Sequence, residues 1–358
     1  MSVRGKILGA AAGAAGIAVA GTAVRVAQRQ RVIARRGAGQ DTPFGSLRSD
    51  PLVVVADDGT DLHVEVDEPS IRGSRAAPDP QPLTVVFAHG YALNLDCWHY
   101  QRAAYRGRVR SVFYDQRSHG RSGRSPVNHC TVEQLGEDLL RVIEATAPGP
   151  VVLVGHSMGG MGVISLAQHH PELFGDKVVG VALLSTTAGG LDTGRLLFPV
   201  LPLGLSGRLV GRAVSALGRG HRVVDLLRSR GRDLAEVVTD DFAFGRDAPR
   251  DHVDFVVDML DATPFSVVAD FWPAFATLDS FDHLGALAQV PTTVIAGTDD
   301  KIVGIGHSRR LHARIHGSSL LEVEGAGHMV IIERPDDVAA ELDDLLDAAG
   351  QLIGGRTA

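Results

Sequence analysis

Cysteine is nearly absent from this sequence, in which only Cys97 and Cys130 occur. Two cysteines are too few for a disulfide framework, and neither stands in a Cys-x-x-Cys or Cys/His spacing that binds structural zinc. Histidine is frequent, but His312 and His316 lack the carboxylate of the HExxH zinc motif, and we interpret them as solvent-exposed side chains. The sequence therefore predicts neither a metal site nor a cofactor.

Acidic residues are absent from the first forty positions, which carry seven lysines and arginines. The rest of the chain then holds 28 basic and 42 acidic side chains, a net charge of −14. With 44% hydrophobic residues in the whole sequence, this part can bury one substantial core. A folded body this acidic repels phosphate backbones, so nucleic acid is excluded as an expected partner.

Charge is also absent from residues 7–24, which lie between Arg4 and Lys6 on one side and a cluster of arginines on the other. The length is close to that of a membrane span, although Ala and Gly make up most of it and insert less favourably than Leu or Ile. Three interpretations fit: a membrane anchor or membrane-associated helix, a secretory signal ending in Ala18-Val19-Ala20, and a disordered or surface-lying basic tail.

The arginines that follow residues 7–24 resist translocation. They favour membrane association through an N-terminal anchor, with the folded body on the cytoplasmic side. A body in the cell envelope or outside the cell is the alternative.

The remaining sequence divides into a linker, a core and an insert. Gly, Pro and Ser scattered through residues 41–50 are typical of a linker that follows the N-terminal segment 1–40. Beyond it, short runs rich in Val, Leu and Phe alternate with segments of helical character, which predicts a mostly parallel sheet flanked by helices. We assign this α/β core to residues 51–189 and 290–350.

Eight strands are predicted in the core, and the turn sequence at residues 57–60 joins the first two as an antiparallel hairpin. Later strands need crossover helices and are therefore expected to be parallel. The strands are Leu52–Ala56, Leu62–Val66, Leu83–Ala88, Ser111–Tyr114, Val151–Val154, Val179–Leu184, Thr292–Ala296 and Ser319–Val323.

About a hundred residues separate the sixth predicted strand from the seventh, far more than one crossover needs. We expect residues 190–289 to form a helical cap, with an apolar run at 196–203 and helices around 206–230, 233–242 and 250–262. The last stretch begins after Pro249 and carries four aspartates along one face, which we interpret as a solvated face rather than a metal site. These aspartates are Asp251, Asp254, Asp258 and Asp261, opposite Val253, Val256, Val257 and Leu260.

Ser157 is the candidate nucleophile. It stands in Gly155-His156-Ser157-Met158-Gly159-Gly160, after the fifth predicted strand and before a helix expected to begin at Met161. Glycines two residues either side of a serine permit the sharp strand-to-helix turn that lifts its hydroxyl toward a substrate. The helix behind it supplies N–H groups and a positive dipole end where negative charge develops.

An acid and a base follow in the order that a serine-based triad of this kind requires. Asp299 and Asp300 come after the seventh predicted strand, and His328 comes after the eighth. Because parallel strands end at one sheet edge, these groups are expected near Ser157. A serine hydroxyl is a weak nucleophile at neutral pH, so an imidazole must take its proton and a carboxylate must orient that ring.

Backbone donors for a negatively charged intermediate are expected from two places. His89-Gly90-Tyr91 follows the third predicted strand, so the N–H of Tyr91 can point into the site together with the N–H of Met158. The oxyanion hole is therefore assigned to Tyr91 and Met158.

Over roughly residues 50–345 the sequence resembles the α/β-hydrolase superfamily, in the branch of esterases, lipases and cofactor-free haloperoxidase-like enzymes. The segment 115–122 is similar to the family's D-x-R-G-x-G-x-S loop, with Ser118 in place of its first glycine. The family's G-x-x-D pattern implies Asp300 as the acid, with Asp299 and then Asp192 as alternatives. The insert matches the family's cap, which shapes the acyl pocket.

The resemblance implies an α/β-hydrolase fold and a cofactor-free Ser157–His328–Asp300 triad acting through an acyl-enzyme on a small-molecule acyl ester. A serine at 157 argues against epoxide hydrolases and haloalkane dehalogenases, whose nucleophile is an aspartate. Perhydrolysis or cleavage of carbon–carbon bonds by the same triad is the alternative activity, and a membrane-tethered binding protein without turnover is the alternative from another class. The natural substrate and the oligomeric state are left open by the sequence.

Overall fold

The computed structural model describes residues 28–34, 36, 42–70, 81–192 and 231–357. The predictions for residues 7–24, 196–203 and 206–230 lie outside this part of the chain. Within the part described, no helix combines the length and the apolar character needed to cross a membrane.

An eight-stranded sheet forms the centre of the molecule, in the order β1-β2-β4-β3-β5-β6-β7-β8. Strand β2 is antiparallel to both of its neighbours, and every other neighbouring pair is parallel. All eight predicted strands are confirmed, with boundaries within two residues of those expected. They are β1 Pro51–Val55, β2 Asp61–Asp67, β3 Thr84–Ala88, β4 Arg110–Tyr114, β5 Val151–His156, β6 Val178–Leu184, β7 Thr292–Gly297 and β8 Ser319–Val323.

Helices cover both faces of the sheet, which is why β5 and β6 are buried along their whole length and read as unbroken apolar runs. Leu153 of β5 belongs to the core under α3 and α4, whereas its neighbours Val152 and Val154 belong to the core under α2 and α13. The core helices are α2 His99–Tyr105, α3 Val132–Thr146, α4 Met158–His169, α11 Gly306–Arg314, α12 Val330–Glu333 and α13 Pro335–Thr357. Short 3-10 helices are η1 Leu95–Trp98, η2 Val127–His129, η3 Pro171–Leu173, η4 Phe281–His283 and η5 Gly285–Gln289.

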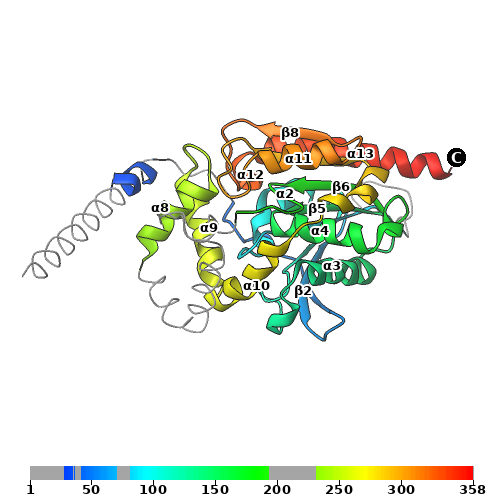
Figure 1. Ribbon diagram of the computed structural model, residues 1–358, viewed down its shortest axis with the longest axis horizontal. Coiled ribbons are helices and arrows are strands. Elements are labelled where there is room, and N and C mark those ends of the chain that lie inside the picture. Colours follow the sequence, from blue (N-terminus) through cyan, green and yellow to red (C-terminus); the bar gives the residue numbers. More distant parts are fainter. Residues whose placement is uncertain (1–27, 35, 37–41, 71–80, 193–230, 358) are drawn as a thin grey trace, which may run out of the picture.

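In the described part of the chain between β6 and β7, three helices gather beyond one end of the sheet (Figure 1). They are α8 Arg232–Ala243, α9 Arg250–Ala262 and α10 Phe265–Thr277, and we refer to residues 231–277 as the cap. Helices α8 and α9 match predicted stretches, but α10 was not predicted because its sequence is apolar with little periodicity and contains Pro273. This helix proves important, since Val267, Phe271 and Phe275 share an apolar cluster with Met158, the neighbour of the candidate nucleophile.

The acidic face of α9 is solvated as expected. Asp258 and Asp261 are exposed, whereas Val253, Val256 and Val257 are buried. Among the described residues no group of three or more histidine, cysteine or carboxylate side chains could hold a metal ion. His312 and His316 are both exposed, and His316 lies beyond the end of α11.

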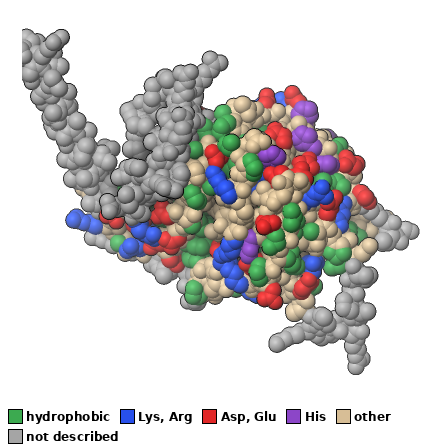
Figure 2. All heavy atoms as spheres, turned by 90° about the horizontal axis from the view of Figure 1, so that it is seen from below, with side chains coloured by type: hydrophobic (Ala, Val, Ile, Leu, Met, Phe, Trp, Pro, Cys, Tyr) green, Lys and Arg blue, Asp and Glu red, His purple; other side chains and the backbone are tan. Residues whose placement is uncertain are grey.

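The described N-terminal residues lie against the cap and the core. Arg29 and Arg36 both donate to the carboxylate of Asp240 on α8, at 2.7 and 2.6 Å, and the Asp240 side chain is fully buried. Phe44 stacks on Phe255 of α9 with ring centroids 4.3 Å apart and meets Tyr100 of α2 edge-on. This stretch therefore bridges cap and core. On the face seen in Figure 2, the coloured acidic and basic side chains are interspersed.

Candidate active site

Ser157 occupies a sharp turn between β5 and α4. Its backbone has φ 52° and ψ −116°, a conformation that a residue with a side chain adopts only when its surroundings enforce it. Its N–H donates to Leu184 O on β6 at 2.9 Å, and its carbonyl accepts from the Thr186 hydroxyl at 2.6 Å. The neighbouring strand therefore holds the strained residue in place, as a nucleophile elbow requires.

Close backbone contacts explain the glycines around Ser157. A Cβ at Gly155 would lie 2.6 Å from Gly160 Cα, and one at Gly159 would lie 2.1 Å from Ala88 O at the end of β3. Helix α4 begins at Met158, three residues earlier than predicted, because the glycines that discouraged a helix in the sequence are tolerated in its first turn. Met158 is thus the first residue of the helix, where an N–H has no partner within the helix.

Asp300 and His328 form a buried pair. His328 Nδ1 lies 2.9 Å from Asp300 Oδ2, with only 8% of the histidine side chain and none of the aspartate exposed. Asp300 Oδ1 accepts from Ile302 N at 2.8 Å and Val303 N at 2.9 Å. Burial, the largest effect, raises the pKa of Asp300, but His328 and these two N–H groups outweigh it and hold the pKa below its usual value. The carboxylate is therefore ionised and fixes Nδ1 of the imidazole as the donor.

The two alternative acids lie elsewhere. Asp299 is 34% exposed and is 3.6 Å from Arg246 of the cap. Asp192 is exposed at the end of the loop that follows β6. Of the three aspartates considered, the structure places only Asp300 against His328.

Ser157 and His328 are connected through His156 rather than by a direct bond. Among the described residues the Ser157 hydroxyl has no hydrogen-bond partner, so the serine–imidazole contact of an assembled triad is not made in this structure. His156 Nε2 lies 3.0 Å from His328 O, and the two rings are 4.9 Å apart. Burial, with His328 nearby, lowers the pKa of His156 to about 3, so its ring is neutral and donates Nε2–H to that carbonyl. His156 thus ties the serine strand to the histidine loop.

His89 orders the loop that carries Tyr91. Its Nδ1–H donates to Gly90 O at 2.7 Å, and its Nε2 accepts from Gln116 N at 2.9 Å, a tautomer that its neutral ring permits because burial lowers its pKa to about 4. Tyr91 packs against the apolar cluster that contains Met158, and their assignment as oxyanion donors stays a prediction. Gly90 has no room for a side chain, because a Cβ there would lie 2.8 Å from His156 Nδ1.

Helix α10 of the cap covers this side of the site. The Tyr91 hydroxyl donates to Val268 O, and the Thr263 hydroxyl donates to Ala92 O at 3.0 Å. Phe275 meets the Tyr91 ring edge-on at 4.8 Å between centroids. The apolar cluster beside Ser157 comprises Cys130, Val132, Leu135, Met158, Met161, Val267, Phe271 and Phe275, with Tyr91 and Leu191 packed against it.

In the loop after β4, Ser118 adopts a backbone conformation that glycine favours, and it stands where the family's loop has a glycine. Ser118 has φ 66°, in the left-handed region that glycine favours. Buried Asp115 accepts from Leu95 N and Arg121 N, and Arg117 is paired with Asp138 at 2.6 Å. These bonds fix the loop although a serine replaces the glycine.

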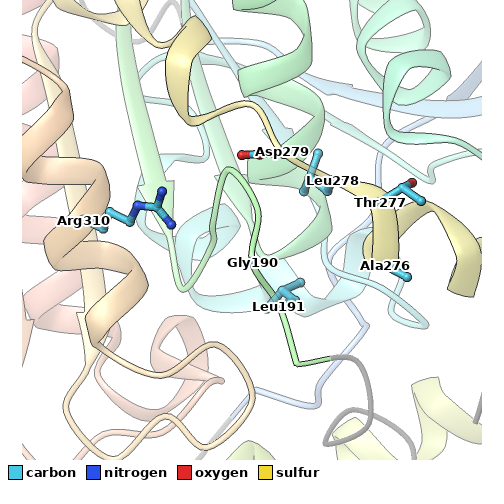
Figure 3. Close-up of a pocket in the computed structure, with 7 residues that line it drawn as sticks. All are labelled: Gly190, Leu191, Ala276, Thr277, Leu278, Asp279 and Arg310. Atoms are coloured by element: carbon cyan, nitrogen blue, oxygen red, sulfur yellow. The ribbon is translucent and has the colours of Figure 1, made fainter. Parts of the chain in front are cut away.

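A pocket of about 320 Å³ lies where the cap joins the core (Figure 3). The loop after β6 and the end of α10 form most of its lining, and Arg310 reaches toward it from α11. Its lining residues are Gly190, Leu191, Ala276, Thr277, Leu278, Asp279 and Arg310, and these do not include Ser157, Asp300 or His328.

Three residues around the site were not predicted: His156, Thr186 and Glu333. His156 lies inside the serine motif and could have been suspected from its position. Thr186 and Glu333 act through backbone groups brought together only by folding, and no local pattern marks them. Glu333 accepts from Gly327 N beside His328 at 2.8 Å.

Comparison with known proteins identifies the family of the chain. Residues 85–341 match the model of the alpha/beta hydrolase family. The chain is 26% identical to 3-oxoadipate enol-lactonase 1 of Acinetobacter baylyi, over 74% of this chain and 87% of that protein. It is 27% identical to non-heme chloroperoxidase CPO-A1 of Kitasatospora aureofaciens, over 75% and 92%.

Among solved structures, a thermophilic esterase from Thermogutta terrifontis is similar, with a TM-score of 0.64 and 22% identity over 84% of this chain and 99% of that one. This likeness concerns the fold. The family match spans most of the chain and includes all three residues proposed for the triad. The chain therefore belongs to the α/β-hydrolase family and is an enzyme of the hydrolase class.

Proposed function

We propose that this protein hydrolyses carboxylic esters with acyl or lipid-like groups, through a Ser157–His328–Asp300 triad and an acyl-enzyme. The observation that carries the proposal is the buried Asp300–His328 hydrogen bond of 2.9 Å beside the strained elbow at Ser157. Asp300 holds Nδ1–H of the imidazole, which leaves Nε2 able to accept the proton of the serine hydroxyl. A side-chain or substrate-induced shift that closes the serine–imidazole distance completes the triad, since such bonds often tighten only when substrate binds.

The proposed reaction has two stages. Ser157 Oγ attacks the ester carbonyl carbon while His328 takes its proton, and the carbonyl oxygen becomes an oxyanion bound by the N–H groups of Tyr91 and Met158. The tetrahedral intermediate collapses, His328 returns the proton to the departing alcohol, and the acyl group remains on Ser157. Water, deprotonated by His328, then attacks the acyl-enzyme, and the acid is released as His328 returns the proton to Ser157 Oγ. The apolar cluster of Phe271, Phe275 and Met161 fits an apolar acyl chain beside Ser157.

The test is a series of p-nitrophenyl esters with acyl chains of increasing length, assayed with wild-type protein and with S157A. We expect hydrolysis by the wild type and a loss of about three orders of magnitude or more in the variant. A fluorophosphonate should label the wild type and leave S157A unlabelled. Equal turnover by S157A would eliminate the mechanism, and an unlabelled, inactive wild type would favour a binding protein that has kept only the fold.

Two second candidates follow from the relatives. The enol-lactonase relative has its activity on a cyclic ester, which the same triad could open by the same steps. The chloroperoxidase relative favours perhydrolysis, in which hydrogen peroxide replaces water and a peracid forms. Carbon–carbon hydrolysis of diketones is a further use of this triad. Turnover of lactones, peracid formation or diketone cleavage well above ester hydrolysis would select the corresponding candidate.

We also propose that residues 7–24 associate the enzyme with a membrane. The proposal is supported by the uncharged length of this stretch and the arginines that follow it. Fractionation of cells that express the protein with and without residues 1–40 tests it: the full chain should sediment with membranes and the shortened chain should not. Recovery of both in the same fraction would refute it.

A further inference from the structure

Glu333 bridges two parts of the chain that folding brings together at the active site. It ends helix α12, five residues after His328. Its Oε1 accepts from Gly327 N at 2.8 Å, and its Oε2 accepts from Gly245 N at 2.7 Å. Gly327 is the neighbour of the proposed base, and Gly245 lies just after cap helix α8. One carboxylate therefore holds the His328 loop and the cap at the same time.

The two bridged segments are in direct backbone contact. Met329 N donates to Ala243 O at 2.8 Å, on the other side of His328 from Gly327. A Cβ at Gly245 would lie 1.9 Å from Gly325 O, and a Cβ at Gly327 would lie 2.3 Å from Phe244 C. The end of α8 is thus seated on the histidine loop with no space for side chains between them. Displacement of this cap segment necessarily disturbs the backbone on both sides of His328.

The charge on Glu333 matters because both of its oxygens face N–H groups. Burial is the largest effect and raises the pKa of Glu333 to about 7, although the N–H groups of Gly245 and Gly327 and the nearby Arg334 lower it and Asp300 raises it further. The two bridged segments also carry His328, Glu324, Arg246 and three aspartates, Asp240, Asp241 and Asp247. The elements packed against α12 carry further charged groups, which include Asp96 on η1, His99 and Arg102 on α2, and Asp336 and Asp337 on α13. A proton on either oxygen would face a donor and break one of the two bonds.

We propose that Glu333 is a positioning residue for the general base: its carboxylate locks the His328 loop to the seated end of α8. His328 is in place for proton transfer only while both bonds are made. The inference deepens the proposed ester hydrolysis and rests on it. Because the base serves the same step for every ester, disturbing Glu333 lowers kcat for short and long acyl chains alike and leaves KM little changed.

The test compares E333Q with E324Q. Glutamine at 333 keeps one acceptor oxygen but turns an NH2 group toward the second N–H, whereas Glu324 lies in the same loop, exposed. With p-nitrophenyl acetate and butyrate we expect kcat of E333Q to fall about tenfold or more, because the loss of one charge-assisted bond is felt at the base. E324Q should stay within about twofold of the wild type, as surface substitutions do.

The pH profile separates positioning from a merely structural role. Below about pH 7, log(kcat/KM) of the wild type should fall more steeply with decreasing pH than that of E333Q, since protonation of Glu333 breaks one of its two bonds only in the wild type. In G245A, whose Cβ unseats the cap segment, kcat should fall similarly, and the G245A/E333Q double variant should be no worse than the more impaired single variant.

Melting temperatures of all variants show which of them are folded under assay conditions. If E333Q does not fold, G245A still tests the inference, because it retains Glu333. Wild-type kcat and slope in folded E333Q or in folded G245A, with S157A inactive, would overturn the role of Glu333 and leave the proposed function standing. Equal activity of S157A and wild type would overturn the function itself.

Discussion

Replacing Asp300 with asparagine tests the pair on which the site depends. In the wild type the carboxylate accepts three N–H groups, from His328, Ile302 and Val303. An asparagine has one acceptor oxygen. If that oxygen stays with the two buried loop N–H groups, the amide NH2 faces His328 Nδ1, and the ring must carry its proton on Nε2, where it can no longer accept one from Ser157. This arrangement is favoured because the amide oxygen then keeps two hydrogen bonds, from Ile302 N and Val303 N, instead of the single bond from His328 Nδ1.

The expected loss in kcat is about three to four orders of magnitude, equivalent to about 4 to 5.5 kcal/mol of transition-state stabilisation. Stability should change less, by about 1–3 kcal/mol, because the loop keeps both of its bonds and a neutral bond from the amide NH2 to Nδ1 replaces the charge-assisted bond between Asp300 and His328. The assay is p-nitrophenyl butyrate hydrolysis with thermal unfolding measured in parallel. D299N is the matched control and should stay within about twofold, since that side chain is partly exposed. D300N activity within tenfold of the wild type would refute the reasoning.

Three further predictions concern stability. G159A should lower the free energy of unfolding by about 4 kcal/mol or more, because its Cβ would lie 2.1 Å from Ala88 O. G162A should raise it by about 0.5–1 kcal/mol, because the nearest atom to its Cβ would be 3.4 Å away. Urea unfolding measures both, and equal effects would contradict the close contact at Gly159. Burial lowers the pKa values of His89, His119 and His156 to about 4, 3 and 3. Below about pH 6.5 the unfolded chain therefore binds protons that the folded chain does not bind, and the free energy of unfolding falls as the pH drops toward 4. In H119N the fall should be shallower by up to about 1.4 kcal/mol per pH unit, and an unchanged slope from pH 6 to 4 would sink this account. D240A should lower the free energy of unfolding by about 3 kcal/mol, because it leaves Arg36, 9% exposed, with only the exposed carboxylate of Asp247 at 3.8 Å, whereas D241A, at an exposed residue, should lower it by less than about 1 kcal/mol. Similar melting curves for the two variants would show that the N-terminal contact adds nothing.

The fold could be predicted from the sequence wherever the pattern of apolar residues indicates which side chains are buried. Strands covered on both faces, such as Val151–His156, give unbroken apolar runs bounded by turns, and their ends mark the sheet edge where Ser157, Asp300 and His328 gather. The start of α4 was misplaced because glycine propensity argues against a helix, and what overrides it is the close packing of Gly159 on β3. Helix α10 was missed because Pro273 and an apolar sequence obscure the helical period that a half-buried helix shows.

The site could be predicted only as far as motifs reach. The choice between Asp299 and Asp300 needed coordinates, since adjacent residues differ in direction and burial: one faces Arg246 near the surface and the other faces His328. The residues that hold the catalytic loops bond to backbone groups, so their sequence positions carry no partner signal. His156 reaches His328 O, and Thr186 reaches Ser157 O.

The cap is bonded to both catalytic loops, which constrains how a substrate reaches Ser157. Tyr91 and Ala92 in the loop after β3 are hydrogen-bonded to Val268 and Thr263, and Glu333 connects the His328 loop to Gly245 after α8. Each neutral hydrogen bond contributes about 0.5–1.5 kcal/mol, and lifting the cap as a rigid lid would break several of them at once. It would also remove the contacts that hold the Tyr91 hydroxyl and the His328 loop in place. A lifted cap would therefore displace both the proposed oxyanion residue Tyr91 and the proposed base His328, so on the proposed mechanism the enzyme is active only with its cap in place.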